Sequence, residues 1–72
     1  MGLAELGDIY LRRADFRQAE RAYLRAEKLQ PEAVEVSLRL YRLYSATGAA
    51  DAARFYYERV LAQGGDVSGL KH

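Results

Sequence analysis

The chain has 72 residues, half of them hydrophobic and 29% charged, and its formal net charge is +1. A chain of this length forms at most one small domain, which buries only about 60% of the surface that its unfolded form exposes. Because cysteine is absent, no disulfide or thiolate metal site can stabilise the core, so stability must come from helix packing or from association.

Composition also excludes several classes of protein. The near balance of charge argues against a dedicated nucleic-acid binder, which is normally strongly basic on one face. No apolar run approaches the roughly 18 residues that would indicate a membrane span, and the N-terminus lacks the layout of a signal peptide. The absence of cysteine favours a cytoplasmic location, although an excised domain would lose its targeting signal.

The N-terminal half predicts two helices. The first covers about residues 2–13, and the second about 16–29. Asp15 precedes the second helix as a good N-cap, and Gln18 three residues later would complete a capping box. The expected buried face of the first helix consists of Leu3, Leu6, Gly7 and Tyr10.

The C-terminal half predicts two more helices, about 32–46 and 50–63. Pro31 cannot continue the preceding helix but suits the first turn of the next one. Gly48 can supply the left-handed C-cap, and Asp51 can cap the last helix or lie in its first turn. The expected buried residues of the third helix are Leu40, Leu43, Tyr41 and Tyr44. No stretch alternates with period two, so we expect an all-α fold.

A shift of 34 residues superimposes these elements. The matched pairs are Leu6 with Leu40, Tyr10 with Tyr44, Ala14 with Gly48, Ala19 with Ala53, Tyr23 with Tyr57, and Arg25 with Arg59. Two helix-turn-helix units at this period resemble the tetratricopeptide repeat family. The first unit has the family's residues at Leu6, Gly7, Tyr10, Phe16, Ala19, Tyr23, Ala26 and Pro31.

The resemblance implies two stacked antiparallel hairpins in a short right-handed α-solenoid. The domain would cover residues 1–65, with repeats at about 1–31 and 32–65. Residues 66–72 would form a short tail or the start of a truncated third repeat. The family pattern lets small residues bring the two helices of a unit together, while Tyr10, Phe16 and Tyr23 fill the space around that contact.

The second unit departs from the pattern. Tyr41 replaces the small glycine, Ala50 replaces the aromatic Phe16, and Val60 replaces Ala26. One hypothesis is an exchange of volume, in which the Tyr41 ring occupies the space that the other two changes leave.

The segment "ARFYYERV" contains three adjacent aromatic residues. By the alignment Tyr57 is the core ring, whereas Phe55 and Tyr56 face outward. These two rings either lie over their own helix and the C-terminal tail or form a contact surface. The last unit also leaves Val60 and Leu61 without obvious cover, so we expect self-association, with a dimer through the fourth helices favoured. The expected interface residues are Phe55, Tyr56, Leu61 and Leu70.

The sequence offers little chemistry for catalysis. His72 is the last residue, and no phosphate loop, metal cluster or Ser/His/Asp set is present, so we expect no enzyme activity and no cofactor. A ridge of cations could track phosphates, but Glu20 and Glu27 interrupt it, which favours a solvated surface and no nucleic-acid partner. The ridge consists of Arg13, Arg17, Arg21, Arg25 and Lys28.

The resemblance places the working surface on the concave side, along the first helix of each unit. The residues expected there are Ala4, Asp8, Leu11, Arg12, Leu38, Arg42 and Ser45. Apolar spots beside charges suit an extended or helical peptide. Some members of the family clamp chaperone C-termini with lysine and asparagine, but Ala4 and Asp8 at those positions argue against that activity. Arg42 can either grip a carboxylate or pair with Asp8 across the repeats.

The expected function is therefore a protein-interaction or scaffolding module that binds a peptide or partner protein and self-associates. Two alternatives remain open. One is a purely structural self-assembly unit, and the other is an excised or designed fragment without a ligand of its own.

Overall fold

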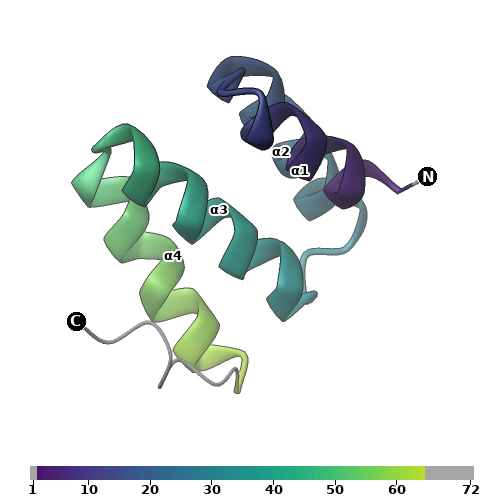
Figure 1. Ribbon diagram of the computed structural model, residues 1–72. Coiled ribbons are helices and arrows are strands. Elements are labelled where there is room, and N and C mark those ends of the chain that lie inside the picture. Colours follow the sequence, from purple (N-terminus) through teal and green to yellow (C-terminus); the bar gives the residue numbers. More distant parts are fainter. Residues whose placement is uncertain (1, 65–72) are drawn as a thin grey trace.

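The computed structural model describes residues 2–64 and is all-helical in that range (Figure 1). The helices lie within about two residues of the predicted bounds. They are α1 (Leu3–Arg12), α2 (Phe16–Leu29), α3 (Val34–Thr47) and α4 (Ala50–Ala62). The predicted fold class is confirmed.

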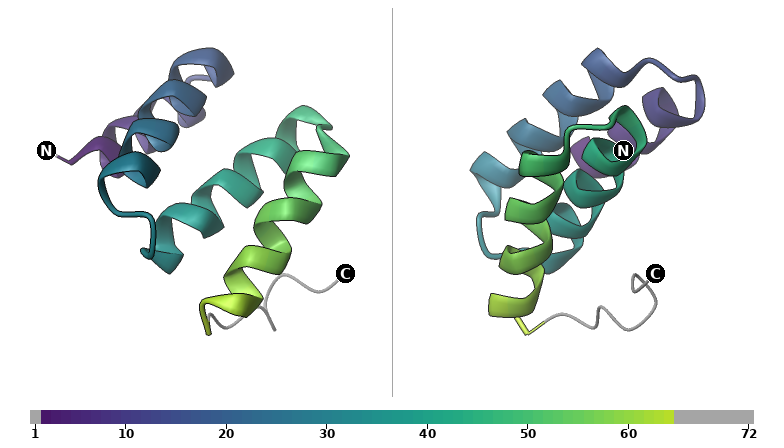
Figure 2. Two further views of the ribbon diagram at one scale, coloured as in Figure 1. Left: turned by 180° about the vertical axis from the view of Figure 1, so that it is seen from behind. Right: turned by 90° about the vertical axis from the view of Figure 1, so that its left-hand side faces the viewer.

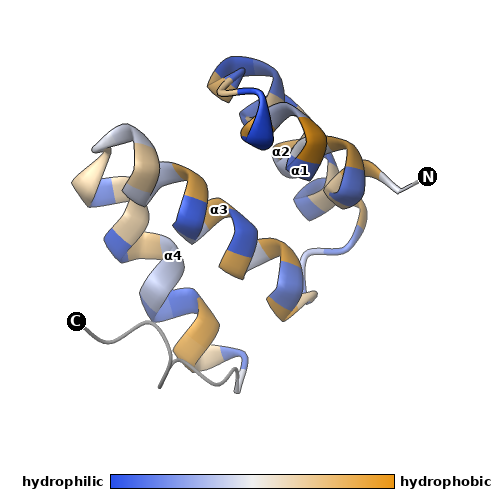
Figure 3. Cartoon of the chain, in the orientation of Figure 1, coloured by the Kyte–Doolittle hydropathy of each residue, from blue (hydrophilic) through white to orange (hydrophobic). Residues whose placement is uncertain are grey.

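The four helices form two hairpins. α1 packs against α2, and α3 packs against α4. The hairpins meet through α2 and α3, with a lighter contact between α1 and α3 (Figure 2). Hydrophobic and hydrophilic residues alternate along all four helices, as expected where each helix buries only one side (Figure 3).

The 34-residue relation is also present in the backbone. Ala14 after α1 has a φ of 59°, and Gly48 after α3 has a φ of 78°, so both turns use the left-handed conformation. In each turn the following N–H donates to a tyrosine carbonyl at 2.9 Å, Asp15 to Tyr10 and Ala49 to Tyr44. The second hairpin therefore repeats the first in local geometry as well as in sequence.

The predicted helix caps are largely confirmed. The side chain of Asp15 accepts a hydrogen bond from the Gln18 backbone N–H at 3.4 Å, as an N-cap does. Gly48 is the left-handed C-cap of α3, and Asp51 lies in the first turn of α4. These local signals explain why the boundaries could be predicted closely.

The predicted position of Pro31 in the first turn of the third helix is wrong. Pro31 lies in the turn before α3, which begins at Val34. The Pro31 carbonyl accepts hydrogen bonds from Arg59 of α4 and from Gln63 directly after α4, each at 3.1 Å. This turn therefore connects the ends of the two hairpins.

The core lies between the hairpins, around α2 and α3. Its buried members are Ala19, Tyr23, Ala26, Val36, Leu40, Leu43 and Tyr56. Gly7 is buried directly against Tyr23, and a Cβ at Gly7 would overlap the Tyr23 ring. Phe16, expected to fill the space around the contact of α1 with α2, sits at the start of α2 and is 38% exposed.

The aromatic segment of α4 corrects a second expectation. Tyr56, expected to face outward, is the buried ring and is 8% exposed. It stacks on Tyr44 with ring centroids 5.8 Å apart, and its hydroxyl donates to Glu27 at 3.2 Å. Its counterpart Ala22 is buried too.

Tyr57, expected to be the core ring, is only partly buried. In the first hairpin, Tyr23 becomes fully buried because glycine stands opposite it. In the second hairpin that position holds Tyr41, whose ring lies 5.7 Å from the Tyr57 ring. Two rings cannot occupy the space of one, so Tyr57 stays nearer the surface and Tyr56 fills the core.

Candidate functional site

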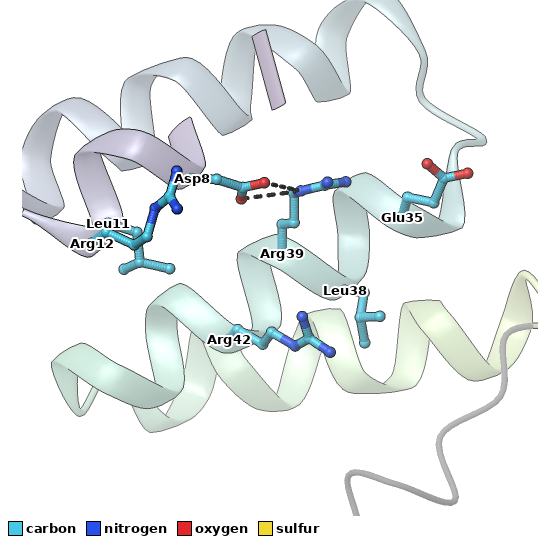
Figure 4. Close-up of a pocket in the computed structure, with 7 residues that line it drawn as sticks. All are labelled: Asp8, Leu11, Arg12, Glu35, Leu38, Arg39 and Arg42. Atoms are coloured by element: carbon cyan, nitrogen blue, oxygen red, sulfur yellow. Dashed lines mark hydrogen bonds and ion pairs between the residues drawn. The ribbon is translucent and has the colours of Figure 1, made fainter. Parts of the chain in front are cut away.

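A hollow between α1 and α3, which we call the α1–α3 groove, has a volume of about 550 Å³ (Figure 4). It is lined by Asp8, Leu11 and Arg12 of α1 and by Glu35, Leu38, Arg39 and Arg42 of α3. Because α1 and α3 touch only lightly, the side chains between them remain accessible. The first helices of the two hairpins thus form its walls.

Five of the seven groove residues predicted from sequence line this hollow, and Ala4 and Ser45 do not. Ser45 lies near the C-terminal end of α3, about one turn beyond Arg42, and is exposed. Sequence reasoning missed Glu35 and Arg39. Both lie on the groove side of α3 because residues three and four positions apart share a helix face, and this spacing was a usable signal.

Asp8 makes the principal polar contact within the groove. The Nε of Arg39 lies 3.1 Å from each of its two carboxylate oxygens. The Tyr23 hydroxyl also donates to Asp8, and an Arg39 terminal nitrogen lies 3.9 Å from Glu5. Of the two alternatives for Arg42, the pair with Asp8 is not formed, because Arg39, one turn earlier on α3, takes that place.

This contact affects Tyr23. Burial raises the pKa of the Tyr23 hydroxyl well above its usual value, and the hydrogen bond to Asp8 raises the pKa further. Burial disfavours the phenolate, and a carboxylate acceptor stabilises the protonated form. Asp8 thus links α1 to both α2 and α3.

The other two arginines of the groove are left with their charges available. Arg12 and Arg42 are exposed, and within residues 2–64 neither forms an ion pair. In Figure 4 the Arg42 guanidinium points away from Asp8 and lies on the same side of α3 as Leu38. Leu11 and Arg12 are neighbours on α1, and Leu38 and Arg42 lie about one turn apart on α3, so each groove wall presents a cation beside an apolar side chain.

A second polar cluster joins the hairpins on the side of α2 and α4. Glu27 accepts the Tyr56 hydroxyl, and an Arg59 nitrogen lies 3.2 Å from its other oxygen. Tyr44 donates to Glu20 at 2.6 Å. Burial and these carboxylate acceptors raise the pKa of Tyr44 above its usual range and that of Tyr56 to about 12. This cluster connects the hairpins.

The predicted interface residues divide into three groups. Phe55 is 55% exposed and Leu61 is 48% exposed, as expected. Tyr56 and Val60 are buried, so the expectation that they lie uncovered at the surface is wrong. Leu70 lies outside the described residues. The cationic ridge of α2 is exposed throughout, which agrees with a solvated surface.

Residues 2–64 contain neither a metal-binding cluster nor a membrane-spanning helix. This range contains no group of three or more His, Cys, Asp or Glu side chains that could hold a metal ion. None of its helices has the length and apolar character needed to cross a membrane. The cytoplasmic location stays a prediction from the sequence.

Comparisons with protein-family models, with curated proteins and with solved structures found no match to the chain.

Proposed function

We propose that this protein is a two-hairpin module of the tetratricopeptide repeat type, which binds a peptide or a segment of a partner protein in the α1–α3 groove. The observation that carries the proposal is the pairing pattern within the groove. Arg39 is held by Asp8, whereas Arg12 and Arg42 have no ion-pair partner among residues 2–64.

This arrangement suits a peptide that carries a carboxylate near an apolar side chain. A guanidinium can bind a carboxylate through two parallel hydrogen bonds. Leu11 and Leu38 offer apolar contact beside the two available arginines. The Asp8–Arg39 pair keeps the groove walls at a set separation, so less ordering is required when a peptide binds.

A library of random displayed peptides, selected against the whole chain, provides the test. A selected peptide is then titrated against the wild type, Arg42→Glu and a matched control, Arg17→Glu, in which an exposed arginine of α2 outside the groove undergoes the same change of charge. We expect Arg42→Glu to weaken binding by about tenfold or more and Arg17→Glu to leave it unchanged.

Two results would contradict the groove proposal. Equal losses in both variants would show attraction by net charge alone. Failure to select any peptide, although the protein is folded, would favour the alternatives without a groove ligand. No catalytic role is proposed.

Self-association is the second candidate function, either beside peptide binding or as the whole purpose of a structural assembly unit. The supporting observation is the exposure of Phe55 and Leu61 on α4. Large apolar side chains on an exposed helix are commonly covered by a partner. The sequence favours a dimer through α4, and in that arrangement Phe55→Glu would abolish the dimer.

A further inference from the structure

The contact between the two hairpins inside the molecule predicts a contact between two copies of the chain, in which each residue is replaced by its counterpart 34 positions away. Because hairpin α3–α4 repeats hairpin α1–α2 at 34 residues in sequence and turn geometry, each hairpin has two comparable sides. One side of each is used in the internal contact. Among residues 2–64, the other two sides are outer surfaces.

Each outer surface is defined by the residues that lie 34 positions in the sequence from the residues of the internal contact. The trailing face consists of Arg42, Tyr57 and Leu61 on hairpin α3–α4, the counterparts of Asp8, Tyr23 and Glu27. The leading face consists of Glu5, Leu6, Tyr10 and Ala22 on hairpin α1–α2, the counterparts of Arg39, Leu40, Tyr44 and Tyr56.

The first shifted contact conserves opposite charges. Inside the molecule Asp8 pairs with Arg39. Shifted by one period, the same contact would bring Arg42 of one copy to Glu5 of the next. Arg42 takes the place of the acid Asp8 and Glu5 takes the place of the cation Arg39, so the pair stays attractive. Arg42 forms no ion pair among residues 2–64, and Glu5 is more than half exposed, with only a long contact to Arg39.

The second shifted contact becomes partly apolar: leucine takes the place of Glu27 and alanine that of Tyr56, while Arg59 corresponds to another arginine, Arg25. Inside the molecule Glu27 meets Tyr56 and Arg59. One period later, Leu61 would meet Ala22 and Arg25. Leu61 is 48% exposed on the trailing face. The leading face has a hollow of about 270 Å³ where Ala22 and Arg25 meet Leu6 and Tyr10. Leu3, Gln18 and Arg21 complete the lining of this hollow. A leucine side chain would contact its apolar residues and the stems of its two arginines.

From these two contacts we propose that a second copy of this chain docks head to tail, with its leading face on the trailing face of the first. This deepens the second candidate function and rests on self-association. The two faces differ, so the contact is heterologous and generates an open chain of copies, whereas a symmetric contact would stop at a dimer. Phe55 corresponds to Arg21 and lies outside the trailing face.

Sedimentation of the whole chain over a range of concentrations tests the proposal. The mass of the wild type is expected to grow beyond that of a dimer. Glu5→Arg damages only the leading face, and Leu61→Glu damages only the trailing face, so each should weaken association by about tenfold or more. Leu24→Glu, at an exposed leucine of α2 on neither face, is the matched control.

Mixing the two defective variants is the most specific measurement. The intact leading face of Leu61→Glu fits the intact trailing face of Glu5→Arg, so an equimolar mixture should form a one-to-one dimer that does not grow. The double variant Glu5→Arg with Arg42→Glu should recover association, because it restores opposite charges. Far-ultraviolet circular dichroism checks that each variant folds, and Arg42→Glu, on the same trailing face, replaces Leu61→Glu if that variant does not fold.

The outcomes separate this inference from the function on which it rests. A fixed dimer that Phe55→Glu abolishes, with no recovery on mixing, would leave self-association standing and overturn the head-to-tail contact. A folded monomer at high micromolar concentration would overturn both.

Discussion

Asp8 and Arg39 join the two hairpins through a single donor that reaches both carboxylate oxygens. The Arg39 Nε lies 3.1 Å from Oδ1 and 3.1 Å from Oδ2. The same carboxylate accepts the hydroxyl of Tyr23, which is fully buried. One acidic side chain on α1 therefore holds both its own hairpin and the next one.

Two substitutions at Asp8 should separate its charge from its hydrogen bonds. Asp8→Asn keeps an acceptor for Tyr23 but removes the charge opposite Arg39, so we expect a loss of about 1 kcal/mol in the free energy of unfolding. Asp8→Ala also leaves the buried Tyr23 hydroxyl without its acceptor, and we expect a loss of about 2–3 kcal/mol. Urea unfolding measures both. Equal stability of Asp8→Ala and the wild type would show that this contact contributes nothing.

Gly7→Ala should destabilise the protein, against the usual helix preference. Alanine in a helix is normally better than glycine by about 1 kcal/mol. Here the new Cβ would overlap the Tyr23 ring, which is buried and cannot move aside, so we expect a net loss of about 1–3 kcal/mol. Thermal unfolding measures the change. In a Tyr23→Leu background the overlap is removed, and persistence of the full penalty there would contradict this explanation.

Opposite effects are expected at the two left-handed turn positions. Ala14 has a φ of 59°, which is strained for a residue with a Cβ, so Ala14→Gly should stabilise the protein by up to about 1 kcal/mol. Gly48→Ala introduces the same strain and should destabilise by about 1 kcal/mol. No atom lies within 4 Å of a Cβ built at Gly48, so the effect comes from the backbone alone. Changes of the same sign in both variants would contradict the prediction.

Alkaline pH should weaken the fold through the buried tyrosine hydroxyls. The pKa of Tyr56 is raised to about 12, above its usual value of 10.0, chiefly by burial and then by its bond to Glu27. Above pH 10 the unfolded chain releases this proton while the folded chain keeps it, so stability falls as pH rises toward 12. Below pH 10 the contribution is fully present.

Tyr56→Phe isolates this contribution. The variant should lose stability less steeply than the wild type between pH 10 and pH 12, because it lacks the Tyr56 hydroxyl. Part of the slope should remain, because Tyr23 and Tyr44 keep their raised pKa values. Unfolding measured at pH 7 supplies the reference for each protein. An unchanged slope in the variant would show that Tyr56 does not carry the effect.

The sequence by itself determined the local structure and most of the groove. Asp15 caps the start of α2 and Gly48 ends α3, each through contacts within a few residues of the chain. The four helices could therefore be placed within about two residues. The 34-residue relation depends on residue identity alone and reappears in the two turns. Five groove residues were expected from the resemblance to the tetratricopeptide repeat family, which places the first helix of each unit along the concave side, and these five line the groove.

Only the tertiary structure decided which partner each side chain takes. Asp8 pairs with Arg39 rather than Arg42 because the crossing of α1 and α3 brings one turn of α3 closer than the next. Tyr56 is buried in place of Tyr57 because Tyr41 occupies the space that Gly7 leaves open in the first hairpin. The partner and the burial of a side chain depend on how side-chain volumes pack between helices that are distant in the sequence. A repeat alignment assumes that both units pack in the same way.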